Sequence, residues 1–154
     1  MFIDKARILV KAGDGGNGMS SFRREKYVPN GGPNGGDGGR GSDIVLVADR
    51  NSNTLIDFRY KRQFKAKDGA PGQTSNKYGR NAETTYIKVP LGTLVKDEES
   101  GHVMCDLIKD GQEYVVAKGG RGGRGNAHFQ NSANRFSMSK NHFHSIFIIR
   151  SIVA

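Results

Sequence analysis

Positively charged side chains beside glycine-rich stretches are the residues of this sequence whose types and spacing could do chemistry. Arg23, Arg24 and Lys26 lie directly before the stretch that is richest in glycine, and Tyr27 follows them. Cationic side chains bind phosphate oxygens, and an aromatic ring can stack on an unpaired base. The pattern predicts a nucleic-acid-binding surface, although Tyr27 could instead anchor the glycine-rich layer while the cations are merely solvated.

Further cations stand near the other glycine-rich stretches and extend this predicted surface. The chain has 24 lysines and arginines against 15 aspartates and glutamates, a formal net charge of +9, which favours phosphate polymers or anionic surfaces as partners. The charge by itself does not choose between them. The remaining candidate nucleic-acid-binding residues are Arg40, Arg62, Lys65, Lys77, Arg80, Arg121 and Arg124.

Other chemistry has little support in the residue pattern. Cys105 stands alone in a strand-like segment, with no base beside it to activate a thiolate. His128, His142 and His144 lack the cysteine or carboxylate neighbours of a recognised metal site. We expect no catalytic residue and no metal site. One cysteine cannot form an intrachain disulfide and no apolar run approaches membrane-spanning length, so we expect a cytoplasmic protein without a membrane partner.

The glycines fall into rows with a spacing of three residues. The chain has 22 glycines, clustered at about 13–41, 69–80 and 119–126. A three-residue period is typical of polyproline II geometry, and a missing side chain at every third residue lets neighbouring segments approach closely. The rows predict one compact bundle of separated stretches, in which the structural glycines are Gly32, Gly35, Gly38, Gly41, Gly119, Gly122 and Gly125.

Two other interpretations of the glycines are weighed against this bundle. Collagen would need a long unbroken period and abundant proline, whereas this chain has four prolines and its period soon breaks. A flexible tail of Arg-Gly type that binds nucleic acid stays open as an alternative. The rest of the chain favours an ordered domain, because short alternating or β-branched apolar runs recur along it.

These runs predict an all-β sandwich or barrel, with the first glycine-rich stretch inserted between its first two strands. Asp110-Gly111 predicts a hairpin turn and 97–101 a longer connection. No segment has a convincing helical period. Strands are expected at about 5–11, 44–47, 54–58, 85–89, 92–95, 103–108 and 114–117.

Several motifs in fixed order resemble the Obg family of GTPases. They cover roughly residues 1–135, which we take as one domain. The resemblance implies an Obg fold, in which a small β-barrel carries a layer of glycine-rich left-handed polyproline-II-type helices. The motifs are 14–18 (Asp-Gly-Gly-Asn-Gly), 21–29 (Ser-Phe-Arg-Arg-Glu-Lys-Tyr-Val-Pro), 31–41, 64–66, 89–93 and 119–127.

The resemblance also implies a function. In the Obg family the tips of the glycine-rich layer enter the aminoacyl-tRNA region of the large ribosomal subunit and touch its rRNA, in subunit assembly and stress control. GTP and magnesium belong to a separate G domain, whose P-loop needs a Gly-Lys pair that this sequence lacks. We therefore expect this chain to be non-catalytic and without a cofactor; a phosphate-binding enzyme that uses a glycine-rich loop is the alternative.

Residues 136–154 diverge from the family pattern. They contain no acidic residue, although the corresponding family stretch is rich in glutamate and ends in a barrel strand. Residues 142–149 could form that last strand. The alternatives are an aberrant end and an exposed, aggregation-prone strand.

Overall fold

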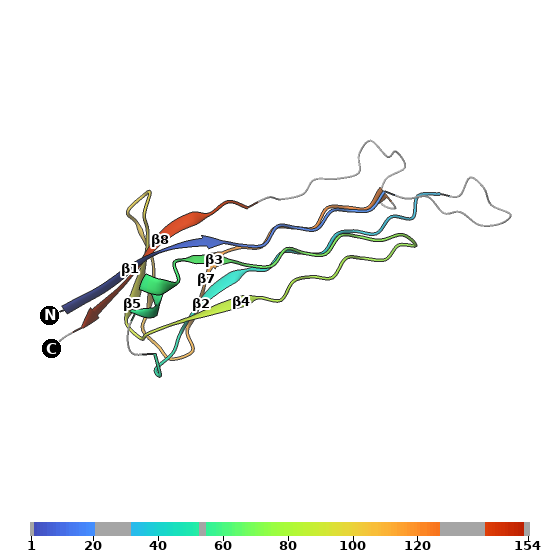
Figure 1. The fold of residues 1–154 in the computed structure, drawn as a ribbon. Helices are drawn as coiled ribbons and strands as arrows, with labels where there is room; N and C mark the ends of the chain where they lie inside the picture. The colour runs from blue at the N-terminus through green and yellow to red at the C-terminus, as the bar shows by residue number, and fades with distance from the viewer. Residues whose placement is uncertain (1, 21–31, 53–54, 127–140, 153–154) are drawn as a thin grey trace.

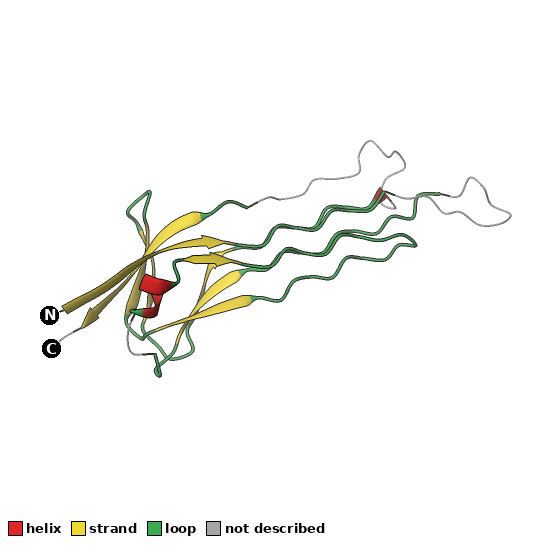
Figure 2. Cartoon of the chain, viewed as in Figure 1, coloured by secondary structure: helices red, strands yellow, loops and turns green. Residues whose placement is uncertain are grey.

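The computed structural model describes residues 2–20, 32–52, 55–126 and 141–152. A β body of two sheets lies at one end, and a slender glycine arm projects from it (Figure 1). The glycine arm comprises residues 12–20, 32–43, 66–84 and 118–126 of the described chain. It contains almost no regular secondary structure, whereas the β body holds the strands and the one short helix (Figure 2). The predicted all-β class is confirmed.

The two sheets have five and three strands. The larger sheet has the order β3-β1-β8-β5-β6 and the smaller one the order β4-β2-β7. β1 pairs in parallel with β3, and β2 pairs in parallel with β4. The strand bounds are β1 Phe2–Lys11, β2 Ile44–Ala48, β3 Gln63–Lys65, β4 Thr85–Val89, β5 Thr93–Asp97, β6 Val103–Leu107, β7 Glu113–Ala117 and β8 His144–Ile152.

The hydrophobic core lies between the two sheets. Alternation places Ala6, Ile8 and Val10 of β1 inward and leaves Lys5 and Arg7 exposed. The inward residues of both sheets form one cluster of buried side chains, which includes Ile44, Leu46, Val89, Val95, Leu107, Ile146 and Ile148. Burying these side chains stabilises the β body, and the sheets then fix where the arm begins.

β8 occupies the middle of the five-stranded sheet. It pairs antiparallel with β1 over nine residues, from Phe2↔Ile152 to Val10↔His144, and on its other side with β5. Ile146 and Ile148 are fully buried. The end of the chain thus forms a central strand here, and not an exposed edge, because its apolar alternation completes the core.

The expected strand at 54–58 is wrong. Residue 54 lies outside the described residues, and α1 (Asp57–Tyr60) follows instead. Leu55 and Phe58 are buried while Ile56 is exposed. That three-residue spacing is the spacing of a helical turn, and a strand would bury alternate residues.

The expected hairpin at Asp110-Gly111 is also wrong. A turn does form, and Gly111 has a φ of 82°. However, β6 pairs with β5 and β7 pairs with β2, so the turn connects the two sheets. Its Gly111 N–H donates to the carbonyl of Ala48, in β2. The connection at 97–101 does join the paired strands β5 and β6, as predicted.

Candidate nucleic-acid interface

Backbone hydrogen bonds with a period of three residues hold the segments of the glycine arm together. Gly13, Gly16 and Met19 donate to the carbonyls of Ser42, Gly39 and Gly36, each at 2.9 Å. Segment 66–73 is bonded in the same way to both 12–20 and 32–43, and segment 118–126 is bonded to both as well. Segment 76–82 also donates to 32–43, which therefore lies at the centre and is bonded to all four of its described neighbours. This arrangement supports the predicted bundle of separated stretches.

The bundle continues the strand pairs of the β body. The parallel pair β1 and β3 leads into the bonds Ala66 N–H to Lys11 and Gly69 N–H to Asp14. On the other side, β2 and β4 extend into the bonds from Ala82 to Arg40 and from Gly79 to Asp37. The backbone period changes from two residues to three where the strands end, so the sheets set the alignment of the arm.

Glycine is required at most rows of the arm because neighbouring carbonyls occupy the place of a side chain. A Cβ added at Gly38 would lie closer than 3.0 Å to the carbonyl of Gly16, and one at Gly122 would meet the carbonyl of Gly38. The same holds for Gly35, Gly41, Gly119 and Gly125. Gly32 differs, because a Cβ there would meet nothing within 4 Å, so the structure gives it no packing role. It lies near the far end of its segment, where no described residue would contact the added Cβ.

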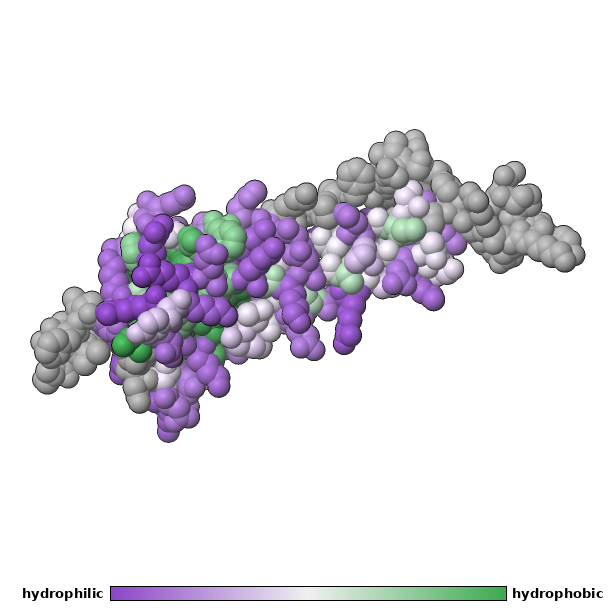
Figure 3. All heavy atoms as spheres, in the orientation of Figure 1, coloured by the Kyte–Doolittle hydropathy of each residue, from purple (hydrophilic) through white to green (hydrophobic). Residues whose placement is uncertain are grey.

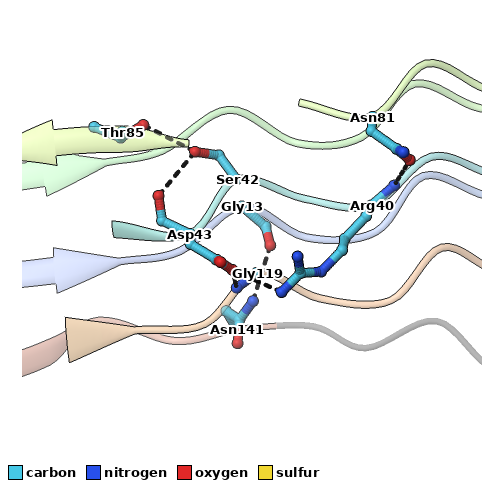
Figure 4. A network of polar contacts seen from close by, with 8 residues as sticks. All are labelled: Gly13, Arg40, Ser42, Asp43, Asn81, Thr85, Gly119 and Asn141. Carbon is cyan, nitrogen blue, oxygen red and sulfur yellow. Dashed lines mark hydrogen bonds and ion pairs between the residues drawn. The ribbon is translucent and has the colours of Figure 1, made fainter. Parts of the chain in front are cut away.

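A polar network fixes the base of the arm to the β body (Figure 4). The Asp43 carboxylate accepts a hydrogen bond from the backbone N–H of Gly119 at 2.6 Å and an ion pair from Arg40 at 2.9 Å. The Ser42 hydroxyl lies 2.9 Å from that of Thr85, and the Asn141 side chain donates to the carbonyl of Gly13. These contacts tie the arm segments 12–20, 32–43 and 118–126 to Thr85 of β4 and to Asn141, which precedes β8.

The aspartates of the arm all serve as acceptors for backbone N–H groups. Asp14 accepts from Asn141, Asp37 from Gly125, and Asp68 from the N–H of Asp14 at 2.8 Å. Together with Asp43, they tie segments that are distant in the sequence. Their negative charge is thus directed at the arm's own backbone.

The cations of the arm project outward. Lys77, Arg80, Arg121 and Arg124 are exposed, and among the described residues no carboxylate forms an ion pair with any of them. Hydrophilic side chains extend from the sides of the slender arm (Figure 3). Lys77 follows the tight turn at Ser75 and Asn76, whose φ angles are 60° and 57°. These four cations, which we call the arm cations, can meet phosphates without first breaking an ion pair.

The structure brings together only some of the candidate binding residues. Arg40 lies on the arm, but its guanidinium is paired with Asp43. Lys65 is in β3 and Arg62 directly precedes it, so both lie on the β body. Arg23, Arg24, Lys26 and Tyr27 lie outside the described residues, and their assignment stays a prediction.

Two cations of the β body were not predicted as binding residues and yet lie beside predicted ones. Lys5 and Arg7 line the same hollow as Arg62 and its neighbour Arg59, which the sequence places in one basic set. Lys5 and Arg7 are more than fifty positions from Arg62 in the sequence, so proximity along the chain could not reveal the group. The alternation of exposed cations along 5–11 was the available signal.

Arg7 of β1 belongs to a surface network that also includes Glu98, in the connection after β5, and Ser145 of β8. Its Nε lies 2.7 Å from Oε2 of Glu98, and Ser145 of β8 donates to the same carboxylate. The hydrogen bond from Ser145 and the one from Arg7 hold the pKa of Glu98 below its ordinary value. Glu98 therefore stays ionised and fixes Arg7 at neutral pH.

Metal and membrane features are absent from the part of the chain that the structure describes. No three histidine, cysteine or carboxylate side chains gather there as potential metal ligands. None of its helices is long and apolar enough to cross a bilayer.

Comparison with known proteins gives a consistent family. The sequence model of the GTP1/OBG family matches residues 3–144, beyond the boundary at 135 expected above. The chain is 61% identical over 135 residues to the GTPase Obg of Syntrophomonas wolfei. The matched residues make up 88% of this chain and 32% of the relative. It is 61% identical over 134 residues to the GTPase Obg of Persephonella marina, covering 87% of this chain and 39% of that protein.

A third relative has a similar extent. The GTPase Obg of Ruminiclostridium cellulolyticum is 64% identical over 129 residues, which make up 84% of this chain and 30% of the relative. The chain therefore spans about a third of the length of these relatives. With its β body, its glycine arm and this match, the chain belongs to the GTP1/OBG family and corresponds to the family's glycine-rich β domain.

Proposed function

We propose that this chain is a non-catalytic recognition domain that docks an Obg-type GTPase onto the large ribosomal subunit by contacts with rRNA. The G domain, with its GTP and magnesium, would belong to the part of the relatives that this chain does not span. In subunit assembly or stress control, this domain would position the GTPase on the subunit, and the G domain would determine when the protein acts.

The observation that carries this proposal is the division of charge on the arm. The arm's aspartates bind backbone N–H groups between segments, while the arm cations are exposed and unpaired with any described carboxylate. A narrow, side-chain-poor element with free cations suits an RNA-lined cleft, because phosphates can approach its backbone closely.

Binding to isolated ribosomal subunits tests the proposal. The chain should co-sediment with large subunits in preference to small ones, and Arg121→Gln with Arg124→Gln should weaken that binding. Lys88→Gln with Lys109→Gln removes the same charge from exposed positions of the β body and is the matched control. Equal binding to both subunits, or equal weakening by both double variants, would indicate only diffuse attraction to RNA.

The proposed absence of GTP chemistry has its own test. Isothermal titration of the chain with GTP and magnesium should give no binding heat above buffer. Micromolar affinity would contradict the non-catalytic assignment and favour a phosphate-binding enzyme that uses a glycine-rich loop.

A further inference from the structure

A hollow on the β body gathers four cations from two separated parts of the chain. Lys5 and Arg7 come from β1, whereas Arg59 comes from α1 and Arg62 from the connection to β3. With Ala6, Leu9 and Phe58 they line a concave pocket of about 430 Å³. None of these lining residues is acidic. We call this hollow the cationic pocket.

Backbone contacts hold the cationic pocket together. The N–H of Leu9 donates to the carbonyl of Arg62 at 2.7 Å, which fixes the connection after α1 against β1. The Nε of Arg62 donates to the carbonyl of Arg59 at 3.2 Å. Phe58 is almost fully buried below, and its ring packs against Phe64 with 5.8 Å between centroids. The two arginines are therefore positioned by the hydrogen bond to β1 and by the buried Phe58 between them and the core.

The charges of the cationic pocket are incompletely compensated. Arg7 pairs with Glu98, and the Lys5 ammonium lies 4.1 Å from the centre of the Phe147 ring. Arg59 and Arg62 are exposed, and no described carboxylate forms an ion pair with either. Gathering like charges in one hollow is unfavourable, and a bound anion offsets the repulsion.

We propose that the cationic pocket binds a phosphate group, with Arg59 and Arg62 as the residues that contact it. Guanidinium groups present paired N–H donors that match phosphate oxygens, and Lys5 and Arg7 add positive potential beside them. The apolar wall of Leu9 and Phe58 removes water from one side, which strengthens the attraction. The site lies on the β body and does not depend on RNA binding by the arm.

Nuclear magnetic resonance of the full chain with inorganic tripolyphosphate at low salt tests this site. Saturable shifts should appear at the backbone amides of residues 5–9 and 58–63. Arg59→Gln with Arg62→Gln should weaken tripolyphosphate binding roughly tenfold or more, because charge-assisted hydrogen bonds are lost. Lys88→Gln with Lys109→Gln should bind like the parent chain.

The mapping on the parent chain keeps the test decisive even if a pocket variant does not fold. Shifts confined to the arm, or equal weakening by the pocket variant and its control, would overturn the proposal. Arg121→Gln with Arg124→Gln should leave binding in the pocket unchanged, so failure of the arm's proposed function and failure of this site give different results.

The source of the phosphate is resolved by competition. A single-stranded RNA oligonucleotide that displaces tripolyphosphate from residues 58–63 would identify an RNA backbone phosphate as the ligand. If tripolyphosphate binds there and RNA does not displace it, the ligand is a free polyphosphate compound. Either result supports a phosphate site, and no binding of tripolyphosphate in the pocket contradicts it.

Discussion

The substitution Gly38→Ala probes the close packing of the glycine arm. Gly38 lies in the central segment, and its N–H donates to the carbonyl of Gly123 at 2.8 Å. Gly123 donates in turn to the carbonyl of Gly16, the atom that an added Cβ at position 38 would meet. A methyl group at Gly38 can be accommodated only if segments 12–20 and 32–43 move apart.

The expected loss follows from the hydrogen bonds at that level. Separation would break or lengthen three bonds: Gly38 to Gly123, Gly123 to Gly16, and Gly16 to Gly39. At a net value of about 1 kcal/mol each, the loss is about 3 kcal/mol. Alanine restricts the unfolded chain and returns roughly 0.4–1 kcal/mol. A net loss of about 2 kcal/mol or more should lower Tm by roughly 4–8 °C.

The assay combines a thermal melt with hydrogen exchange, and Gly32→Ala is the matched control. Gly32 belongs to the same row of glycines, but its Cβ would meet nothing within 4 Å. The Gly38 variant should lose amide protection at Gly16 and Gly123, whereas the Gly32 variant should keep both protection and Tm. Equal protection in both variants would refute the close-packed bundle.

Three further predictions concern the β body. Ile146→Asp should abolish cooperative melting, because it places an unpaired charge in the core strand β8, whereas His142→Asp, at an exposed position, should melt normally. Glu98→Gln should destabilise the chain at neutral pH. Because folding depresses the pKa of Glu98, the stability that its carboxylate contributes is present above a pH of about 4.5 and disappears as the pH falls through the folded pKa. Thermal melts of the parent chain and of the variant should therefore converge in acid. Burial raises the pKa of Cys105, so a disulfide reagent at pH 8 should react more slowly with folded chain than with chain in urea; equal rates would contradict this.

The strands and the glycine bundle were predictable because each has a local period. Alternation marked β1 and β4, and the three-residue rows marked segments that now lie together. Pairing was less predictable, because turn chemistry at Gly111 fixes a bend without fixing the partner strand. The helical turn at Leu55 and Phe58 was missed because a three-residue spacing between only two apolar residues is a weak signal among β-rich surroundings.

The candidate site was predictable only in part. Glycines beside Arg121 and Arg124 marked the arm cations from sequence alone. The cationic pocket was not predictable, since its residues come from β1 and from α1 with the connection that follows it, which are far apart in the sequence and meet only in the folded chain. Gly32 shows the limit of a repeat: it fits the period, yet a Cβ there would meet no atom of the described residues within 4 Å.

Salt titration of binding to isolated large subunits tests the central claim most directly. If arm cations contact RNA phosphates, the logarithm of affinity falls linearly with the logarithm of salt concentration. Neutralising Arg121 and Arg124 should flatten that slope by about 0.7–0.9 per lost contact, while the Lys88 and Lys109 control keeps the parent slope. Identical slopes for the parent chain, the arm variant and the control would contradict RNA recognition by the arm.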